Sequence, residues 1–349
     1  MEHQRKLFQQ RGYSEDLLPK TQSQRTWKTF NYFTLWMGSV HNVPNYVMVG
    51  GFFILGLSTF SIMLAIILSA FFIAAVMVLN GAAGSKYGVP FAMILRASYG
   101  VRGALFPGLL RGGIAAIMWF GLQCYAGSLA CLILIGKIWP GFLTLGDDFT
   151  LLGLSLPGLI TFLLFWLVNV GIGFGGGIVL NKFTAILNPF IYIVFGGMAI
   201  LAISLVGLGP IFDYIPSGIQ IADNSRFLFL VVTNAVVAVW AAPGVRASAF
   251  TQNAHSCRWQ SLGQTLGLVV AYILFAVAGV CIIAGASIHY GADTWNVLDI
   301  VQRWDSLFAS FFAVLVILMT TISTNDTGSI LPAGYQNDAI APTKLTNKN

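Results

Sequence analysis

Polar residues interrupt a long apolar segment near the N-terminus. The stretch SVHNVPNYVMVGG, residues 39–51, contains His41, Asn42 and Asn45. Pro44 lies among them, and proline removes a backbone hydrogen bond and kinks or ends a helix. Backbone groups freed in this way inside a membrane must line a cavity or lie buried in protein. The stretch therefore predicts a broken helix whose free carbonyl groups and amides could bind a ligand.

A second apolar segment contains a similar interruption. The stretch AVWAAPGVRAS, residues 238–248, has Pro243 and Gly244 in succession. The two interruptions lie five predicted spans apart. Paired broken helices at corresponding positions indicate a transporter built from repeats, with its binding site between the breaks. For either break alone, an ordinary proline kink is the alternative.

Two apolar segments also carry aromatic and amide side chains. Trp119 and Gln123, from IMWFGLQCYAG, are four residues apart and so share one helix face. An indole offers a flat face to a planar ring, and a carboxamide offers both a donor and an acceptor. Trp240 supplies a second indole near the second break. Packing with an interhelical hydrogen bond would explain the Trp119–Gln123 pair equally well.

The last apolar segment contains a dense polar cluster within MTTISTNDTGSILPAGY. Its hydroxyl groups, together with carbonyl groups freed at a helix break, could coordinate a hard cation such as sodium. Serine and threonine also bond back to helix carbonyl groups, which is the alternative interpretation. An ionisable residue inside a span is a functional candidate. The polar residues of the cluster are Thr320, Thr321, Ser323, Thr324, Asn325, Asp326, Thr327 and Ser329.

These segments belong to a chain with the composition of a membrane protein. Of its 349 residues, 57% are hydrophobic and 9% are charged, whereas soluble domains average about 25% charged residues. A soluble core could not bury this much apolar surface, and a β-barrel would need short alternating segments. Apolar runs long enough to cross a bilayer predict eight spans: Phe30–Leu55, Thr59–Leu79, Gly112–Ile135, Leu156–Ile172, Phe190–Leu208, Phe227–Ala247, Leu266–Ile288 and Leu307–Leu331.

The basic residues indicate how the chain crosses the membrane. If the N-terminus lies in the cytoplasm, all 18 lysines and arginines except Lys137, Arg226 and Arg303 fall on the inner side. This asymmetry follows the positive-inside rule and predicts a cytoplasmic N-terminus. It also explains the net charge of +6 without nucleic acid as a partner. The four cysteines form no CxxC pair, so we expect neither a disulfide nor a metal site from them.

Several motifs resemble those of nucleobase–cation symporter family one, which comprises purine, cytosine, allantoin and hydantoin permeases. The motifs are TWKTFNYFTLWMGSVHNVPNY, NGAAGSKYGVPFAMILRASYGVRG, MWFGLQ and TTISTN, and the resemblance extends over essentially the whole chain. It implies an all-α polytopic membrane protein with a five-plus-five inverted-repeat fold and broken helices one and six. It also implies a monomeric transporter of the bacterial inner membrane, not an enzyme, that imports allantoin by symport with a cation. Uracil, cytosine and hydantoin are alternative substrates.

The resemblance implies roles for individual residues. Two indoles would hold the substrate ring between them, and amides would bond to its ureide edge. The expected substrate contacts are Asn42, Trp119, Gln123, Trp240 and Asn325. The coupling cation would be Na⁺, or a proton, in which case no metal ion is bound; no other cofactor is expected. The expected cation ligands are the carbonyl groups of Gly38, His41 and Thr320 and the hydroxyl groups of Ser323 and Thr324.

The chain also departs from the family pattern. Ala249 stands where family members often have an acid, Asp326 where a small neutral residue is usual, and Ser329 where an asparagine is common. The sequence ends shortly after the eighth span, so we expect the family's last spans to be missing. The expected organisation is a cytoplasmic segment 1–29, a first repeat 30–208, a partial second repeat 209–334 and a polar tail 335–349.

These departures leave an alternative function open: a truncated membrane protein that keeps the binding chemistry but transports little or nothing. A channel would need a pore-lining repeat or a ring of charges, and an intramembrane enzyme would need a nucleophile or metal motif. The sequence shows neither pattern, and its histidines are scattered: His3, His41, His255 and His289. A transporter is therefore the predicted function.

Overall fold

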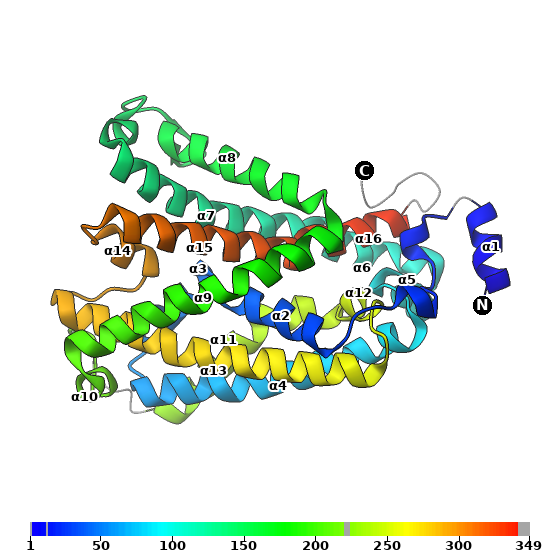
Figure 1. Ribbon diagram of the computed structural model, residues 1–349, viewed down its shortest axis with the longest axis horizontal. Helices are drawn as coiled ribbons and strands as arrows, with labels where there is room; N and C mark the ends of the chain where they lie inside the picture. Colours follow the sequence, from blue (N-terminus) through cyan, green and yellow to red (C-terminus); the bar gives the residue numbers. More distant parts are fainter. Residues whose placement is uncertain (1, 12, 220–223, 341–349) are drawn as a thin grey trace.

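The computed structural model describes residues 2–11, 13–219 and 224–340, and this part of the chain is almost entirely helical. Long helices run side by side and form an elongated bundle (Figure 1). Within the described part, seven helical runs are long and apolar enough to cross a membrane, which confirms the all-α, multi-pass prediction. The long helices are α4 (Thr59–Tyr87), α7 (Ala115–Ile138), α8 (Leu156–Gly173), α9 (Gly176–Val206), α11 (Ser225–Val245), α13 (Cys257–Tyr290) and α15 (Leu307–Asn325).

Shorter elements extend these helices. Helix α7 is preceded by α6 (Leu105–Leu109) and a π-helical turn, η3 (Leu110–Ile114). Helix α15 continues into a second π-helical turn, η5 (Asp326–Ile330), and then into α16 (Leu331–Ile340). Of the predicted polar tail, residues 335–340 form the end of α16, and residues 341–349 lie outside the described part.

The two ends of the bundle carry the remaining elements. Helices α5 and α12 lie near α1 at one end, and α10 and α14 lie at the other (Figure 1). Two short strands, β1 and β2, pair antiparallel with Thr150 opposite Ser155. The bounds are α1 (Glu2–Gln10), η1 (Glu15–Leu17), η2 (Gln22–Gln24), α5 (Phe91–Gly103), η4 (Pro140–Thr144), β1 (Thr150–Leu151), β2 (Leu154–Ser155), α10 (Leu208–Phe212), α12 (Ser248–Thr251) and α14 (Val297–Gln302).

The first predicted span is broken, as expected, into α2 (Thr29–Val40) and α3 (Val43–Ile54). The two residues between the helices have extended backbone conformations. The Asn42 side chain accepts a hydrogen bond from the Asn45 backbone N–H at 3.1 Å and donates one to the Ser39 carbonyl oxygen at 3.2 Å. The asparagine therefore satisfies backbone groups that the break leaves free, as a helix cap does.

The second break lies slightly further along the chain than predicted. Helix α11 continues through Pro243 and ends at Val245, and α12 begins at Ser248. Pro243 cannot donate a backbone hydrogen bond to the Val239 carbonyl group, and the helix ends two residues later. The side-chain amide of Asn80 on α4 donates to the Gly244 carbonyl oxygen at 3.1 Å and satisfies one acceptor at this helix end.

Some helices extend well beyond the apolar runs that predicted them. Helix α13 begins at Cys257, although the predicted span begins at Leu266. Its polar first turns are helical because their amides bond to the neighbouring helix. Gln260 donates to the Val78 carbonyl oxygen at 3.3 Å, and Gln264 donates to the Met77 carbonyl oxygen at 3.2 Å.

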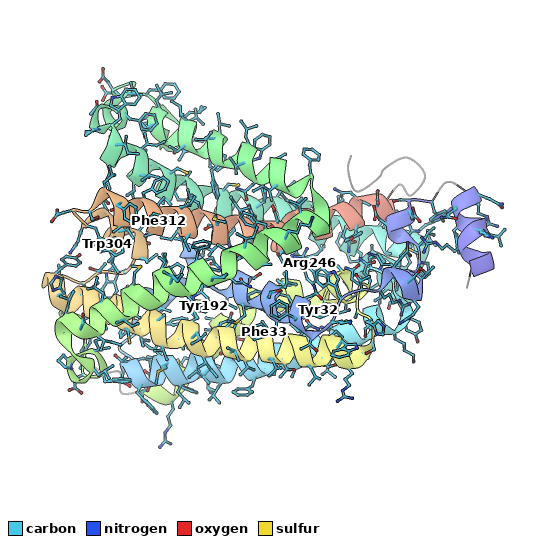
Figure 2. All side chains as sticks on the ribbon, in the orientation of Figure 1. Tyr32, Phe33, Tyr192, Arg246, Trp304 and Phe312 are labelled. Carbon is cyan, nitrogen blue, oxygen red and sulfur yellow. The ribbon has the colours of Figure 1, made fainter. Side chains whose placement is uncertain are left out.

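Small residues let the central helices approach closely. A methyl group added to Gly267 of α13 would lie 2.9 Å from the Cα atom of Phe33 in α2. A methyl group added to Gly84 of α4 would lie 2.6 Å from the Cα atom of Ser248. Figure 2 marks Phe33 and the fully buried Tyr32 at the α2–α13 contact. Such close backbone contacts hold helices together where the solvent is itself apolar.

The residues before α2 are anchored across one end of the bundle. The Trp27 backbone N–H donates to the Asn253 carbonyl oxygen at 2.9 Å, and the Arg25 guanidinium donates to the Ser85 carbonyl oxygen at 3.1 Å. The Lys20 ammonium donates to the side-chain oxygen of Asn253. Burial lowers the pKa of Lys20 below its usual value. This segment therefore ties α4 to the loop that connects α12 and α13.

Candidate functional site

A small cavity lies where the two breaks meet α7 and the end of α15. Its borders include Asn42, Trp119, Trp240, Pro243 and Gly328. The space between atoms there is about 330 Å³, part of it open to solvent, and about 20 Å³ of it could hold the centre of a water molecule. One water molecule needs roughly 10–15 Å³ by this measure. The cavity must therefore widen before it can accept a ring.

Both predicted indoles border this cavity. Trp240 is buried, and its ring packs edge-to-face against that of Trp36 with ring centres 5.4 Å apart. Among the described residues, the Trp240 indole nitrogen has no hydrogen-bond partner. Trp119 lies beside Gly328, because a methyl group added to that glycine would be 3.4 Å from the Trp119 indole nitrogen. The structure thus brings together two flat surfaces and an unsatisfied donor.

Gln123 is completely buried on α7, one turn beyond Trp119. Within the described part of the chain, neither its amide nitrogen nor its amide oxygen has a hydrogen-bond partner. An unsatisfied buried group of this kind costs about 1–3 kcal/mol. A ligand that offers both an acceptor and a donor would remove this cost, so the predicted role of Gln123 fits its chemistry.

The amide of Asn325 contacts residues of α7 and α8. Its amide nitrogen donates to the side-chain oxygen of Asn169 on α8 at 3.1 Å and lies 3.6 Å from the Cys124 sulfur on α7. Neither Asn325 nor Gln123 is among the residues that border the cavity, and the substrate contacts of both stay predictions. Sequence reasoning missed Asn169, although a lone amide in the apolar run FWLVNVGIG was a usable signal.

The expected cation ligands lie between α2 and α15. The Thr324 hydroxyl donates to the Ser39 carbonyl oxygen at 3.0 Å and lies 2.9 Å from the Thr320 carbonyl oxygen. The Ser323 hydroxyl is buried and has no partner among the described residues. Gly38 is buried near the end of α2, where helix carbonyl groups lose their partners. The oxygen-rich surroundings and the unsatisfied Ser323 hydroxyl fit a small hard cation.

The ring of His41 packs among aromatic side chains. Its Nδ1 atom lies 2.9 Å from the Tyr46 hydroxyl oxygen, and its ring centre lies 5.6 Å from that of Phe195 and 5.8 Å from that of Phe275. Among the described residues, its Nε2 atom is buried without a hydrogen-bond partner. The contact of the His41 backbone carbonyl group with a cation stays a prediction.

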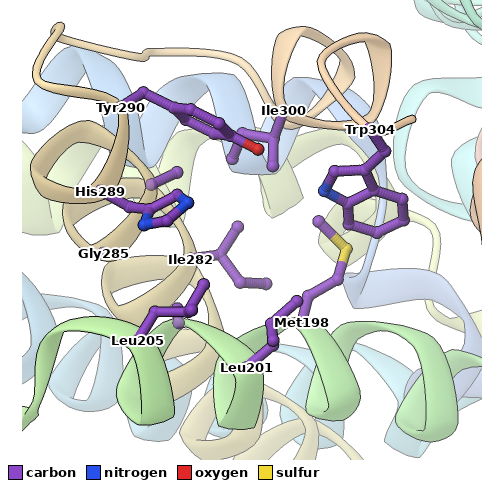
Figure 3. A pocket seen from close by; sticks show the side chains of 11 residues that line it. Met198, Leu201, Leu205, Ile282, Gly285, His289, Tyr290, Ile300 and Trp304 are labelled. Atoms are coloured by element: carbon purple, nitrogen blue, oxygen red, sulfur yellow. The ribbon is translucent and has the colours of Figure 1, made fainter. Parts of the chain in front are cut away.

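Two other cavities have different chemistry. One is a partly open pocket of about 350 Å³ between α9, α13 and α14, and its lining is apolar apart from His289, Tyr290 and Trp304 (Figure 3). The other is an open cleft of about 1110 Å³ between α7, α8 and α16, bordered by Trp166 and Ser329. Neither lies between the two helix breaks, where broken-helix transporters bind their substrates. The cavity at the breaks is therefore the candidate site.

Comparison with known proteins identifies the family. A sequence profile described as permease for cytosine/purines, uracil, thiamine, allantoin matches residues 19–349. The chain belongs to this permease family, nucleobase–cation symporter family one. It is 93% identical over 349 residues to a putative allantoin permease of Escherichia coli (strain K12), covering all of this chain and 72% of that protein. It is 36% identical over 323 residues to the allantoin permease of Bacillus subtilis (strain 168), covering 92% of this chain and 66% of that protein.

Solved structures show the same fold. The family member Mhp1, in a closed conformation with bromovinylhydantoin bound, superposes with a TM-score of 0.74 at 20% sequence identity. The match covers 96% of this chain and 71% of the Mhp1 chain. The expected transporter fold of this family is therefore confirmed, and the chain is shorter than the family members it matches. The individual substrate and cation contacts stay predictions.

Proposed function

We propose that the protein is a secondary transporter that imports allantoin together with Na⁺ or H⁺. The observation that supports this proposal is the cavity between the two helix breaks, bordered by Asn42, Trp119 and Trp240. Allantoin is an uncharged ring with N–H and C=O groups, so indole faces and amides match it better than charged side chains do. The bacterial relatives named as allantoin permeases support the same substrate.

One carbonyl group links the proposed substrate and cation sites. The Ser39 carbonyl oxygen accepts hydrogen bonds from the Asn42 amide at 3.2 Å and from the Thr324 hydroxyl at 3.0 Å. A cation bound to the Thr324 oxygen would polarise its O–H group and strengthen the bond to Ser39. That bond holds the end of α2 in place and, with it, the Asn42 amide. Each ligand then favours binding of the other, as thermodynamic linkage requires.

Direct binding to the purified full chain tests this proposal. We expect saturable binding of radiolabelled allantoin that Trp119→Ala weakens about tenfold or more, because an aromatic stacking partner is lost. Trp139→Ala is the matched control, because this exposed tryptophan follows the end of α7 far from the cavity. Unchanged affinity in Trp119→Ala would reject the proposed ring contact.

The coupling ion needs separate measurements. If Na⁺ is coupled, replacing it with K⁺ should weaken allantoin binding, and Ser323→Ala should remove the difference between the two salts. If a proton is coupled, binding should depend on pH and not on Na⁺. Competition by hydantoin, uracil and cytosine then ranks the possible substrates, and allantoin should compete best.

A second candidate function is ring binding with little or no transport. It is supported by Asp326, a buried carboxyl group in η5 at a position where the family resemblance implies a small neutral residue. Uptake of labelled allantoin into cells that make this chain separates the two functions. Binding to the purified protein without uptake supports the second, and cation-dependent uptake rejects it.

We also propose how the protein sits in the membrane. The end of the bundle that carries α1, α5 and α12 would face the cytoplasm of a bacterial inner membrane, because most basic residues are found in segments at this end. Segment 1–29 would then be cytoplasmic, with the first repeat over 30–208 and a partial second repeat over 209–334. We expect a monomer, which the mass of the detergent-purified protein would test.

A further inference from the structure

Two arginines lie against one carbonyl oxygen inside the bundle. Arg246 follows the end of α11, and its Nη2 atom donates to the carbonyl oxygen of Gly328 in η5. Arg111, in η3, donates to the same oxygen at 3.3 Å. Arg246 is fully buried, and Figure 2 marks its place within the bundle. Three segments that are far apart in the sequence therefore bring two guanidinium groups side by side.

Both guanidinium groups keep donors that lack an acceptor. In the part of the chain that the structure describes, Nη1 of Arg246 and both Nε and Nη1 of Arg111 are buried without a hydrogen-bond partner. The ion pair found among the described residues joins Arg5 to Glu15 at 2.6 Å and involves neither of these arginines. Guanidinium stays protonated in proteins, so loss of a proton does not relieve the charges.

The arrangement is electrostatically incomplete. The positive charge of Arg111 acts unfavourably on that of Arg246, and a buried charge without a counter-charge is strongly unfavourable. The Gly328 carbonyl supplies only a partial negative charge. An anion that accepts the remaining N–H groups would offset both positive charges and satisfy the three donors in charge-assisted hydrogen bonds.

We propose that Arg111 and Arg246 bind a small inorganic anion of the halide class. A small ion is favoured because Arg246 is fully buried, so a large anion could not reach its guanidinium group. The anion is neither the transported ring nor the coupling cation. It joins η3, the end of α11 and η5, and so stabilises the wall of the cavity that Gly328 and Pro243 form.

Thermal unfolding of the purified full chain, without any substrate, tests this site. Tryptophan fluorescence is followed in sodium chloride and in sodium gluconate at equal ionic strength, since gluconate is too large for an enclosed site. Chloride should raise the unfolding midpoint in a saturable manner, by about 3 °C or more. Equal midpoints in the two salts would overturn the proposal. The result does not depend on allantoin binding, so the two proposals can fail separately.

Variants locate the effect. Arg111→Gln should abolish the chloride-dependent rise, because it removes the donors of the less buried partner. Arg102→Gln, at an exposed arginine a few residues away, should keep the full rise. Arg246→Gln should also abolish it; if this variant does not fold in either salt, Arg111→Gln decides. A full chloride-dependent rise in Arg111→Gln would place the ion elsewhere and overturn the proposal.

Discussion

The carboxyl group of Asp326 lies in surroundings that should destabilise the protein. Its side chain is 1% exposed, and among the described residues neither of its oxygens has a hydrogen-bond partner. It lies within a helical run that is apolar enough to cross a membrane, where solvent cannot supply the missing hydrogen bonds. Asp326→Ala removes both unsatisfied oxygens and should therefore stabilise the fold.

The size of this effect follows from the two unsatisfied atoms. A buried polar group without a partner costs about 1–3 kcal/mol. We expect Asp326→Ala to raise the free energy of unfolding by about 2 kcal/mol, since the small void that is left offsets part of the gain. An unfolding entropy of about 2 cal/mol/K per residue gives about 0.7 kcal/mol/K for 349 residues. The unfolding midpoint should therefore rise by about 3 °C.

Thermal unfolding in detergent, followed by tryptophan fluorescence, measures this rise. Asp293→Asn is the matched control, because Asp293 accepts hydrogen bonds from the Tyr214 hydroxyl at 2.7 Å and the Ser217 backbone N–H at 3.0 Å. Removing that charge should lower the midpoint. A lower midpoint for Asp326→Ala as well would refute the reasoning, because it would show that this carboxylate has a stabilising partner.

Three further predictions concern packing, the first break and pH dependence. Gly50→Ala should lower the unfolding midpoint by several degrees, because its methyl group would lie 2.8 Å from the Cα atom of Trp295. Gly51→Ala is the control: its methyl group meets no atom within 4 Å, and the variant should stabilise α3 by about 0.5–1 kcal/mol. Asn42→Ala should lower the free energy of unfolding by about 1 kcal/mol, because the α3 cap is lost, and should also weaken allantoin binding. If thermal unfolding and allantoin binding were both unchanged in this variant, the prediction would be wrong. Burial raises the pKa of Tyr214 above its usual value of 10.0, so the unfolded chain loses this proton first. Stability should fall as the pH rises above about 10, and Tyr214→Phe should reduce that slope by one proton in urea unfolding at several pH values.

Local chemistry made the first break predictable. Proline and asparagine both act on the nearest backbone groups, so Pro44 and Asn42 specify where α2 ends and α3 begins. The second break was displaced because Pro243 lies close enough to a helix end for α11 to continue past it. A proline limits where a helix can continue, but its neighbours decide whether the helix ends there.

Contacts between distant segments were less predictable. The direction of Asn325 depends on Asn169, more than 150 residues away, which accepts its amide hydrogen bond at 3.1 Å. Arg111 and Arg246 meet because of how η3 and η5 pack. In the sequence, each arginine alone indicates only which side of the membrane its segment faces. Trp119 and Trp240 both border the cavity near the breaks, and their predicted contact with a substrate ring stays a prediction.

The two π-helical turns affect how the cavity can widen. Turns η3 and η5 lie on helical runs that pack against each other, and η5 forms part of the cavity border. A π-helical turn holds one residue more than the α-helical pattern requires. If this extra residue shifted along the helix, one backbone hydrogen bond would replace another, and the helical hydrogen bonds on either side would stay intact. The residues beyond it would then rotate relative to the cavity, which would widen without unfolding a span.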